Sequence, residues 1–108
     1  SGTDRSSVLV FDEVDTHVGG RLGNVIGKKL RRLARHHQVI CITHLPQIAA
    51  YATRHLHVAK TTQADRTRTV VRLVEGQDRI EELAEMIAGP NKTPTSLRQA
   101  RELLDRAK

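Results

Sequence analysis

Two short apolar runs limit the folds open to this chain more than any other feature. The first is "VLVF" at residues 8–11 and the second is "VICI" at residues 39–42, and both are rich in β-branched residues. Uninterrupted runs of this kind are typical of strands that are covered on both faces, as in parallel sheets. Residues 12–38 lie between them and contain one helical pattern, which suits a crossover connection. The sequence therefore predicts a parallel βαβ unit and an α/β fold.

The connecting segment is predicted to break at Gly19–Gly20 and then to form an amphipathic helix from Arg21 to about Arg35. Its apolar positions recur at helical spacing, at Leu22, Val25, Ile26, Leu30 and Leu33. After the second strand, Pro46 suits the first turn of another short helix, which we expect to end near Thr53. Among the predicted elements, the crossover helix is the main one that could cover the two strands. We therefore expect half of this sheet to lie outside the sequence.

The second half of the chain changes its pattern. "HLHVAK" (55–60) and "TRTVVRLV" (67–74) alternate in polarity and are separated by a polar stretch, which predicts an antiparallel hairpin. An amphipathic helix follows, with Glu81 and Glu82 expected near its N-terminal end and Gly89–Pro90 expected to end it. A last helix is predicted to begin at Thr93–Pro94. The apolar positions of these two helices are Ile80, Leu83, Ala84 and Ile87, and then Leu97, Ala100, Leu104 and Ala107.

Composition narrows the class of protein. The 108 residues suit one domain or a piece of one, and the opening "SGTDRSSV" suggests a cut in a longer chain, without a signal peptide. No apolar run approaches the roughly 20 residues of a membrane span. Cys41, the single cysteine, is expected to be a buried small hydrophobe, and an intracellular, cytoplasmic location fits best. The formal net charge of +6 favours a polyanionic neighbour.

Polar residues follow both predicted strands. Asp12 and Glu13 come after the first, and Thr43 and His44 come after the second. Because the carboxyl ends of parallel strands share one edge, we expect these side chains to converge there. Two carboxylates and an imidazole suit phosphoryl transfer to water, which needs a metal-binding acid, a group that orients water and a donor to the terminal phosphate. The alternative is that a buried strand has simply reached a charged surface.

These motifs resemble a known family. "VLVFDEVD" resembles the Walker B strand of ABC-type ATPase heads, and "ICITH" resembles their histidine-switch strand. More narrowly, "DEVD" followed by "GGR" and then "THLPQIA" resembles the RecN DNA-repair ATPases, which are related to the structural-maintenance-of-chromosomes proteins. The resemblance continues through the hairpin to the closing "RQARELL" and so covers nearly the whole chain. It implies that residues 1–108 are the C-terminal lobe of a P-loop ATPase head, without the Walker A lobe and the coiled coil.

The resemblance implies roles for several residues. Asp12 would hold Mg²⁺ through water, Glu13 would polarise the attacking water, and His44 would sense the γ-phosphate of ATP. Residues 14–20, with Asp15, Gly19 and Gly20, occupy the place of the D-loop, which touches a partner head across the nucleotide. Gly19 stands where many such heads carry an aspartate, so only the location of that loop transfers.

The phosphate-cradling loop of these ATPases has no counterpart here. The nearest imitation is "GNVIGKK" (23–29), which has three residues between its glycines and Lys29 where Ser or Thr belongs. It also lies within the predicted crossover helix, where no cradle of backbone amides can open. We therefore expect the isolated chain to be inactive as an ATPase.

The resemblance also implies partners for the complete protein. These are ATP and Mg²⁺, the N-terminal lobe of the same head, a second head in a homodimer, and DNA at double-strand breaks during recombinational repair in the nucleoid, with no membrane partner. Two alternatives stay open at this stage. One is a non-catalytic, basic nucleic-acid-binding module, and the other is a head of a different structural-maintenance-of-chromosomes-like ATPase.

Three further features have competing interpretations. The run "KKLRRLARHH" is either a solvated helix face or a surface that faces DNA, through Lys28, Lys29, Arg31, Arg32 and Arg35. His55 and His57 share a strand face, but without cysteine partners or helical spacing they do not predict a structural zinc site. Gln47 is either part of the site around His44 or a helix-surface residue.

Overall fold

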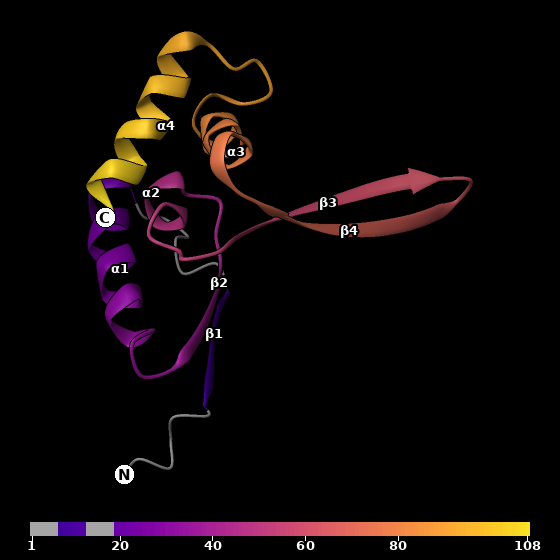
Figure 1. Cartoon of the computed structure of the whole chain (residues 1–108). Coiled ribbons are helices and arrows are strands. Elements are labelled where there is room, and N and C mark those ends of the chain that lie inside the picture. Colours follow the sequence, from indigo (N-terminus) through magenta and orange to yellow (C-terminus); the bar gives the residue numbers. More distant parts are fainter. Residues whose placement is uncertain (1–6, 13–18) are drawn as a thin grey trace.

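The computed structural model describes residues 7–12 and 19–108 (Figure 1). In chain order the elements are β1 (Val8–Asp12), α1 (Gly20–Leu33), β2 (Gln38–Ile42), α2 (Pro46–Ala49), β3 (His55–Gln63), β4 (Arg66–Val74), α3 (Gly76–Ala88) and α4 (Pro94–Arg106). The α/β class is therefore as the sequence predicts. None of the helices in this part of the chain is long and apolar enough to cross a membrane.

Strands β1 and β2 form a parallel pair, which confirms the predicted crossover. The register runs from Val8 opposite Gln38 to Asp12 opposite Ile42, and α1 connects the two strands. Figure 1 shows β1 and β2 side by side, with α1 along one side of them. Both strands therefore end at the same edge, as a parallel connection through one helix requires.

One face of this sheet lacks the cover that its sequence predicts. Exposed and half-buried residues alternate along both strands. The exposed apolar side chains are Val8, Val10, Ile40 and Ile42, which are 46–62% accessible. Alternation places them all on one face, because successive side chains of a strand point to opposite sides. The expectation of two covered faces is thus met on one side only within the described chain.

Helix α1 packs differently from the prediction. Three residues of its apolar stripe are exposed: Leu22, Val25 and Leu33. The buried positions are Gly23 and Gly27, which face the α2 segment. A Cβ on Gly27 would overlap the ring of Tyr51, so the absence of a side chain is what lets this ring lie against α1. The helix is thus anchored through its glycines, a contact that hydrophobic periodicity cannot reveal.

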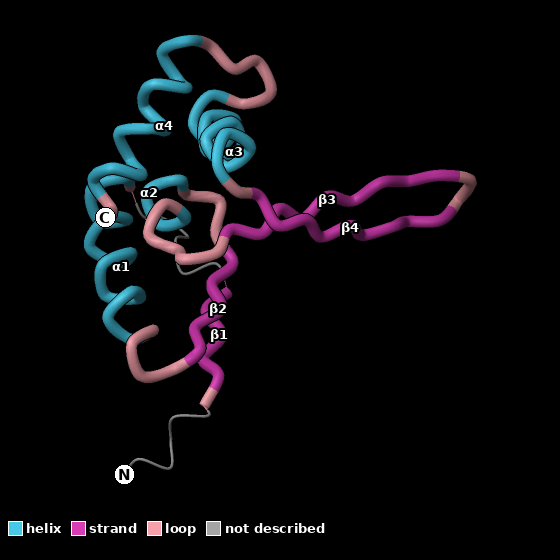
Figure 2. Tube along the Cα trace, in the orientation of Figure 1, coloured by secondary structure: helices cyan, strands magenta, loops and turns pink. Residues whose placement is uncertain are grey.

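The β3–β4 hairpin is longer than predicted. Its strands pair from His55 opposite Val74 to Gln63 opposite Arg66, so most of the polar stretch expected to be a loop is strand. Only Ala64 and Asp65 form the turn, and both have positive φ values, of 50° and 65°. Two-residue turns with this backbone match the twist of a hairpin. Figure 2 shows the hairpin reaching away from the helices as a two-stranded ribbon.

Helices α2, α3 and α4 share the main hydrophobic core. Leu83, Ala84 and Ala100 are fully buried there, and Ala49 of α2 joins them. Thr93 begins α4 as predicted, with a reciprocal capping box to Ser96 that satisfies two backbone N–H groups. The predicted apolar positions of both helices thus form the core because their spacing places them on facing sides.

Two helix boundaries differ from prediction. Helix α3 begins at Gly76, so Glu81 and Glu82 lie in its middle, and Asp78 is the acid of the first turn. Gly89 follows the helix, as expected, with φ of 81° and ψ of −167°, a backbone conformation that favours glycine and cannot continue a helix. Helix α2 ends at Ala49, several residues before the predicted end near Thr53.

Candidate functional site

The predicted site residues of the two parallel strands lie at one edge of the sheet. Asp12 is the last residue of β1 and pairs in register with Ile42, the last residue of β2. The chain continues from Ile42 directly into Thr43 and His44, so these residues leave the sheet beside Asp12. Asp12 and His44 are exposed, and Thr43 is half-buried. The juxtaposition expected from the βαβ topology is therefore present for these three residues.

A tight turn holds the chain after β2. The Thr43 hydroxyl oxygen accepts a hydrogen bond from the backbone N–H of Leu45 at 3.0 Å, which is a local turn that threonine favours. Leu45 then precedes α2, whose first residue is Pro46. Pro46 suits this place because it lacks an N–H that the first turn could not use. His44 is consequently fixed between the end of β2 and the start of α2.

Glu13 and Asp15 lie outside the described residues. Their predicted roles, and that of the loop up to Val18, therefore stay predictions. Gly19 precedes α1 in an extended conformation and Gly20 begins the helix. Gln47 is half-buried, and its Cβ would lie 3.2 Å from a Cβ placed on Gly23. Gln47 thus sits in the contact between α1 and α2.

Two arginines bind backbone carbonyl groups at the ends of α2 and α4. Arg31 of α1 donates from Nε to the Tyr51 carbonyl at 3.0 Å and from Nη1 to the Ala107 carbonyl, and its guanidinium lies 5.5 Å from the Tyr51 ring centre. Arg79 of α3 donates from Nη2 to the Ala52 carbonyl at 2.7 Å, and to two further carbonyls of the same segment. Helix ends leave carbonyls without intrahelical partners, and these arginines satisfy them.

This arrangement changes the interpretation of Arg31. The sequence placed it in a basic run that is either a solvated helix face or a surface that faces DNA, whereas the structure uses its guanidinium to join α1, the α2 segment and the end of α4. Burial lowers the pKa of Arg79 from its ordinary value, and the nearby Arg31 lowers it further. Two like charges are thus held close together. Sequence patterns gave no indication of Arg79, because its partners are 27–30 residues away in the chain.

The other basic residues of the predicted surface are exposed. Lys28, Lys29 and Arg32 lie on α1, and Arg35 follows it. No ion pair involves any of them within residues 7–12 and 19–108. Their charge is therefore available to a partner outside this part of the chain.

The histidines of β3 form a separate, partly buried cluster. His55 is 8% exposed, and its pKa is lowered to about 4 by burial first, then by the charges of Arg79 and His57. His57 Nε2 lies 3.6 Å from Glu82 Oε1, and burial raises the pKa of that carboxyl. Among the residues with described positions, no group of three His, Cys, Asp or Glu side chains could hold a metal ion.

These features define a class. A parallel βαβ unit with Asp12 and His44 at its carboxyl edge, followed by an antiparallel hairpin and two helices, is compatible with a lobe of the heads of ABC-type and structural-maintenance-of-chromosomes-like proteins. The chain matches no protein-family model.

Individual relatives identify the family. The chain is 46% identical over its full length to the DNA repair protein RecN of Streptomyces coelicolor, of which it covers 19%. It is 52% identical to RecN of Mycobacterium leprae over 94% of the chain and 17% of that protein, and 44% identical to RecN of Bacillus subtilis over 92% and 17%. The chain therefore belongs to the RecN family of DNA repair proteins, as a segment that corresponds to a C-terminal region of its members. It spans less than a fifth of their length.

Proposed function

We propose that this segment is the C-terminal lobe of an ATP-hydrolysing head that acts in recombinational repair of DNA double-strand breaks. One observation carries the proposal. All 108 residues of this chain are similar to a segment of RecN. Within them, the parallel register brings Asp12 to the same edge of the sheet as Thr43 and His44. That edge is where α/β sheets bind their ligands.

Each residue at this edge has a chemical task in the proposal. The exposed carboxylate of Asp12 offers the hard oxygen ligands that Mg²⁺ prefers and would hold that ion, which neutralises phosphate charge. Glu13 polarises the attacking water. His44 donates to the γ-phosphate, where negative charge increases during hydrolysis.

The rest of such a head would come from outside these 108 residues. They contain no glycine-rich phosphate loop, and the sheet exposes Val8, Val10, Ile40 and Ile42 on one face. The relatives are more than five times longer than the matched segment. We infer that the remainder of the polypeptide covers this face and cradles the phosphates, and that two heads clamp ATP between them. The isolated segment then hydrolyses no ATP.

The test is Glu13→Gln in the full-length protein. The amide keeps the shape of the side chain and loses the charge that polarises water, so turnover should fall about 100-fold or more. ATP binding should persist, and ATP-bound dimers should accumulate. Glu85→Gln is the matched control, because it makes the same change at an exposed position of α3, away from this edge.

Steady-state turnover, nucleotide binding and molar mass with ATP are the three measurements. Normal turnover in Glu13→Gln would remove this residue from the reaction. Efficient Mg²⁺-dependent turnover by the 108-residue segment alone would contradict the need for a second lobe.

A further inference from the structure

Charge is unevenly distributed among the helices. Helix α1 carries five Lys or Arg residues and no acidic one, whereas α3 carries four acidic residues and a single arginine. Helix α4 has three arginines and two acidic residues. Positive charge therefore gathers mainly on α1, α4 has a small excess of it, and negative charge gathers on α3.

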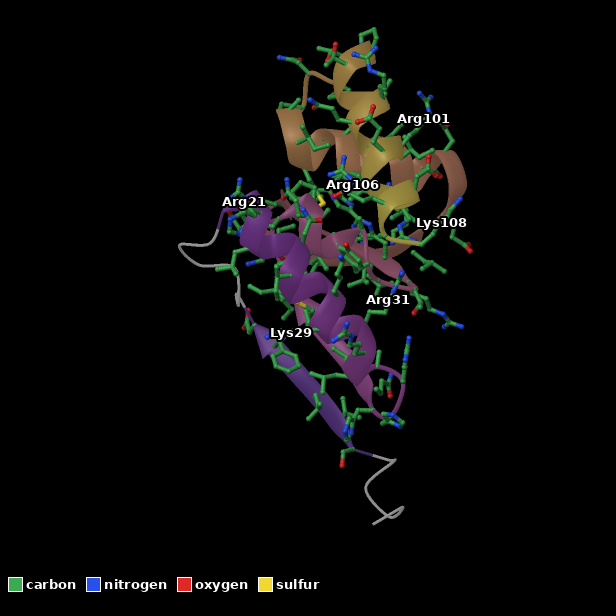
Figure 3. The ribbon with its side chains drawn as sticks, turned by 90° about the vertical axis from the view of Figure 1, so that its left-hand side faces the viewer. Arg21, Lys29, Arg31, Arg101, Arg106 and Lys108 are labelled. Carbon is green, nitrogen blue, oxygen red and sulfur yellow. The ribbon has the colours of Figure 1, made fainter. Side chains whose placement is uncertain are left out.

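The positive side chains of α1 and α4 occupy one side of the molecule. Figure 3 shows that side, which we call the basic face and define by five residues of α1, α4 and the C-terminal end: Arg21, Lys29, Arg101, Arg106 and Lys108. All five are exposed. Of these five residues, only Lys108 forms an ion pair with a described residue, Asp105, at 3.4 Å.

Helix stability does not explain this charge. Arg21 lies in the first turn of α1, which contains no acidic residue. A cation at that end opposes the helix dipole and costs about 0.3–1 kcal/mol. Arg21 forms no ion pair with the residues whose positions are described, so its unfavourable place on a basic face points to a partner that carries negative charge.

The basic face borders a cationic pocket of about 470 Å³. Arg31, Arg79, Arg101 and Lys108 line it, and Asp105 is the only acidic residue among its described lining. Arg101 and Lys108 belong to both the pocket and the basic face. The pocket thus continues the surface inward, between the end of α4 and the first turns of α3.

Two of these cations are held rigidly. The carbonyl hydrogen bonds of Arg31 use Nε and Nη1, and those of Arg79 use Nη2. Nη2 of Arg31 and Nη1 of Arg79 make no further hydrogen bond to the described residues. Fixed guanidinium groups lose little entropy when they bind an oxyanion, and their donors suit phosphate oxygens.

We propose that the basic face binds the phosphate backbone of duplex DNA and that the cationic pocket takes one of its phosphates. Cations spread over two helices match a polymer with regularly spaced charges better than a single small anion. The choice of DNA rests on the proposed role in DNA repair, whereas the phosphate chemistry rests on the surface itself.

Paired substitutions in the full-length protein test this proposal. Arg101→Gln with Lys108→Gln removes two cations from the pocket rim, and Arg21→Gln with Lys29→Gln removes two from α1. Arg66→Gln with Arg68→Gln is the matched control, with the same charge change near the hairpin turn. The affinity for a short duplex is measured over a range of salt concentrations, without ATP. Each of the first two pairs should reduce the slope of log affinity against log salt by about 2, and the control should not.

Asp105→Asn should change the affinity for DNA in the opposite direction. It removes the acidic group from the pocket and releases Lys108 from its ion pair, so the affinity for DNA should rise. A structural role for these residues predicts no such gain. An unchanged or lower affinity, in a variant that melts like the parent protein, would overturn the pocket as a phosphate site.

Inorganic phosphate separates a specific pocket from general screening. At equal ionic strength, phosphate should displace the duplex more strongly than chloride in the parent protein, and equally in the Arg101→Gln, Lys108→Gln pair. Equal displacement in the parent would overturn the pocket. Equal slopes for all three paired variants would overturn the basic face.

ATP turnover measured on the same preparations keeps the two proposals apart. Reduced salt slopes in the paired variants, together with normal ATP turnover, would support DNA binding by the basic face. Normal slopes in the paired variants, together with a Glu13→Gln variant that lacks turnover, would overturn the surface and leave the ATPase proposal in place. The reverse pattern would leave the surface in place and overturn the ATPase.

Discussion

Helices α3 and α4 and the strands of this protein differ in how far they bury their own apolar surface. Leu83, Ala84 and Ala100 of α3 and α4 are fully buried. By contrast, Val10 of β1 is 62% exposed, and Leu56 of the hairpin is 57% exposed. Helices α2, α3 and α4 thus complete a core within these residues, whereas both sheets present apolar faces that nothing in the described chain covers.

Helices α2, α3 and α4 have a buried core of their own, whereas the two sheets leave apolar side chains exposed. Large contiguous apolar patches on a protein surface usually mark interfaces. We propose that the sheets are interfaces with the rest of a longer polypeptide, in keeping with the more than fivefold length of the RecN relatives. The predicted catalytic edge belongs to the incomplete part, so activity should depend on assembly and stability should depend on the helices.

The largest expected effect is in the helical core. Leu83→Ala removes a fully buried side chain and should lower the free energy of unfolding of the 108-residue chain by about 2–5 kcal/mol. Leu56→Ala on the exposed hairpin should change it by no more than about 0.5 kcal/mol. Urea denaturation of both variants measures this. Equal losses would show that the hairpin belongs to the same core as the helices.

The edge of the parallel sheet should show the opposite behaviour. His44 is exposed, so His44→Ala should cost the fold no more than about 1 kcal/mol. In the full-length protein it should raise the barrier to hydrolysis by about 2.7–4 kcal/mol, the effect of losing a donor to developing charge. Thermal melts and turnover on one preparation measure both. A much lower melting temperature with normal turnover per folded molecule would make His44 a structural residue.

His55, at the base of the hairpin, is buried like the residues of the helical core and should contribute to stability. This contribution should depend on pH. The pKa of His55 is about 4 in the folded chain against 6.5 ordinarily, so the unfolded chain takes up the proton first as the pH falls. This residue's contribution to stability is present above pH 6.5 and is lost between pH 6.5 and 4. The free energy of unfolding should fall by about 2 kcal/mol between pH 7 and pH 5 from this residue.

Denaturation curves at the two pH values, on the parent and on His55→Gln, isolate that contribution. His36→Gln is the control, because His36 is exposed. The pH dependence should be smaller in His55→Gln than in the control. An identical pH dependence in both variants would place the acid sensitivity elsewhere.

The smallest effect concerns the contact that joins α1 to the helical core. Gly27→Ala would place a methyl group against the Tyr51 ring, and such overpacking costs about 1–3 kcal/mol. Alanine favours a helix over glycine by about 1 kcal/mol, so a net loss of about 1 kcal/mol is expected. Gly23→Ala is the matched variant and should lose less, because its new Cβ would lie 3.2 Å from the Cβ of Gln47. If Gly27→Ala were more stable than the parent, α1 would have to move easily enough to make room for the methyl group beside Tyr51.

Much of the fold was predictable from local patterns. The apolar runs, the helical spacing in α3 and α4, and the Thr93–Pro94 start of α4 each depend on residues close in the chain. The position of Asp12 at the same edge of the sheet as Thr43 and His44 was also predictable, because one crossover helix forces the two strands to run parallel. Boundaries were less certain, as the longer hairpin and the earlier start of α3 show.

Tertiary structure decided how side chains are used. By sequence, Arg31 resembled its exposed neighbours on α1, and Leu22 resembled a core residue. In the structure Arg31 binds carbonyls of Tyr51 and Ala107, whereas Leu22 is exposed and Gly27 makes the buried contact. Periodicity in a sequence shows that a helix has an apolar stripe, because that depends on residues three or four apart. Which surface meets that stripe, and which cation meets a carbonyl, depends on segments distant in the chain that only folding brings together.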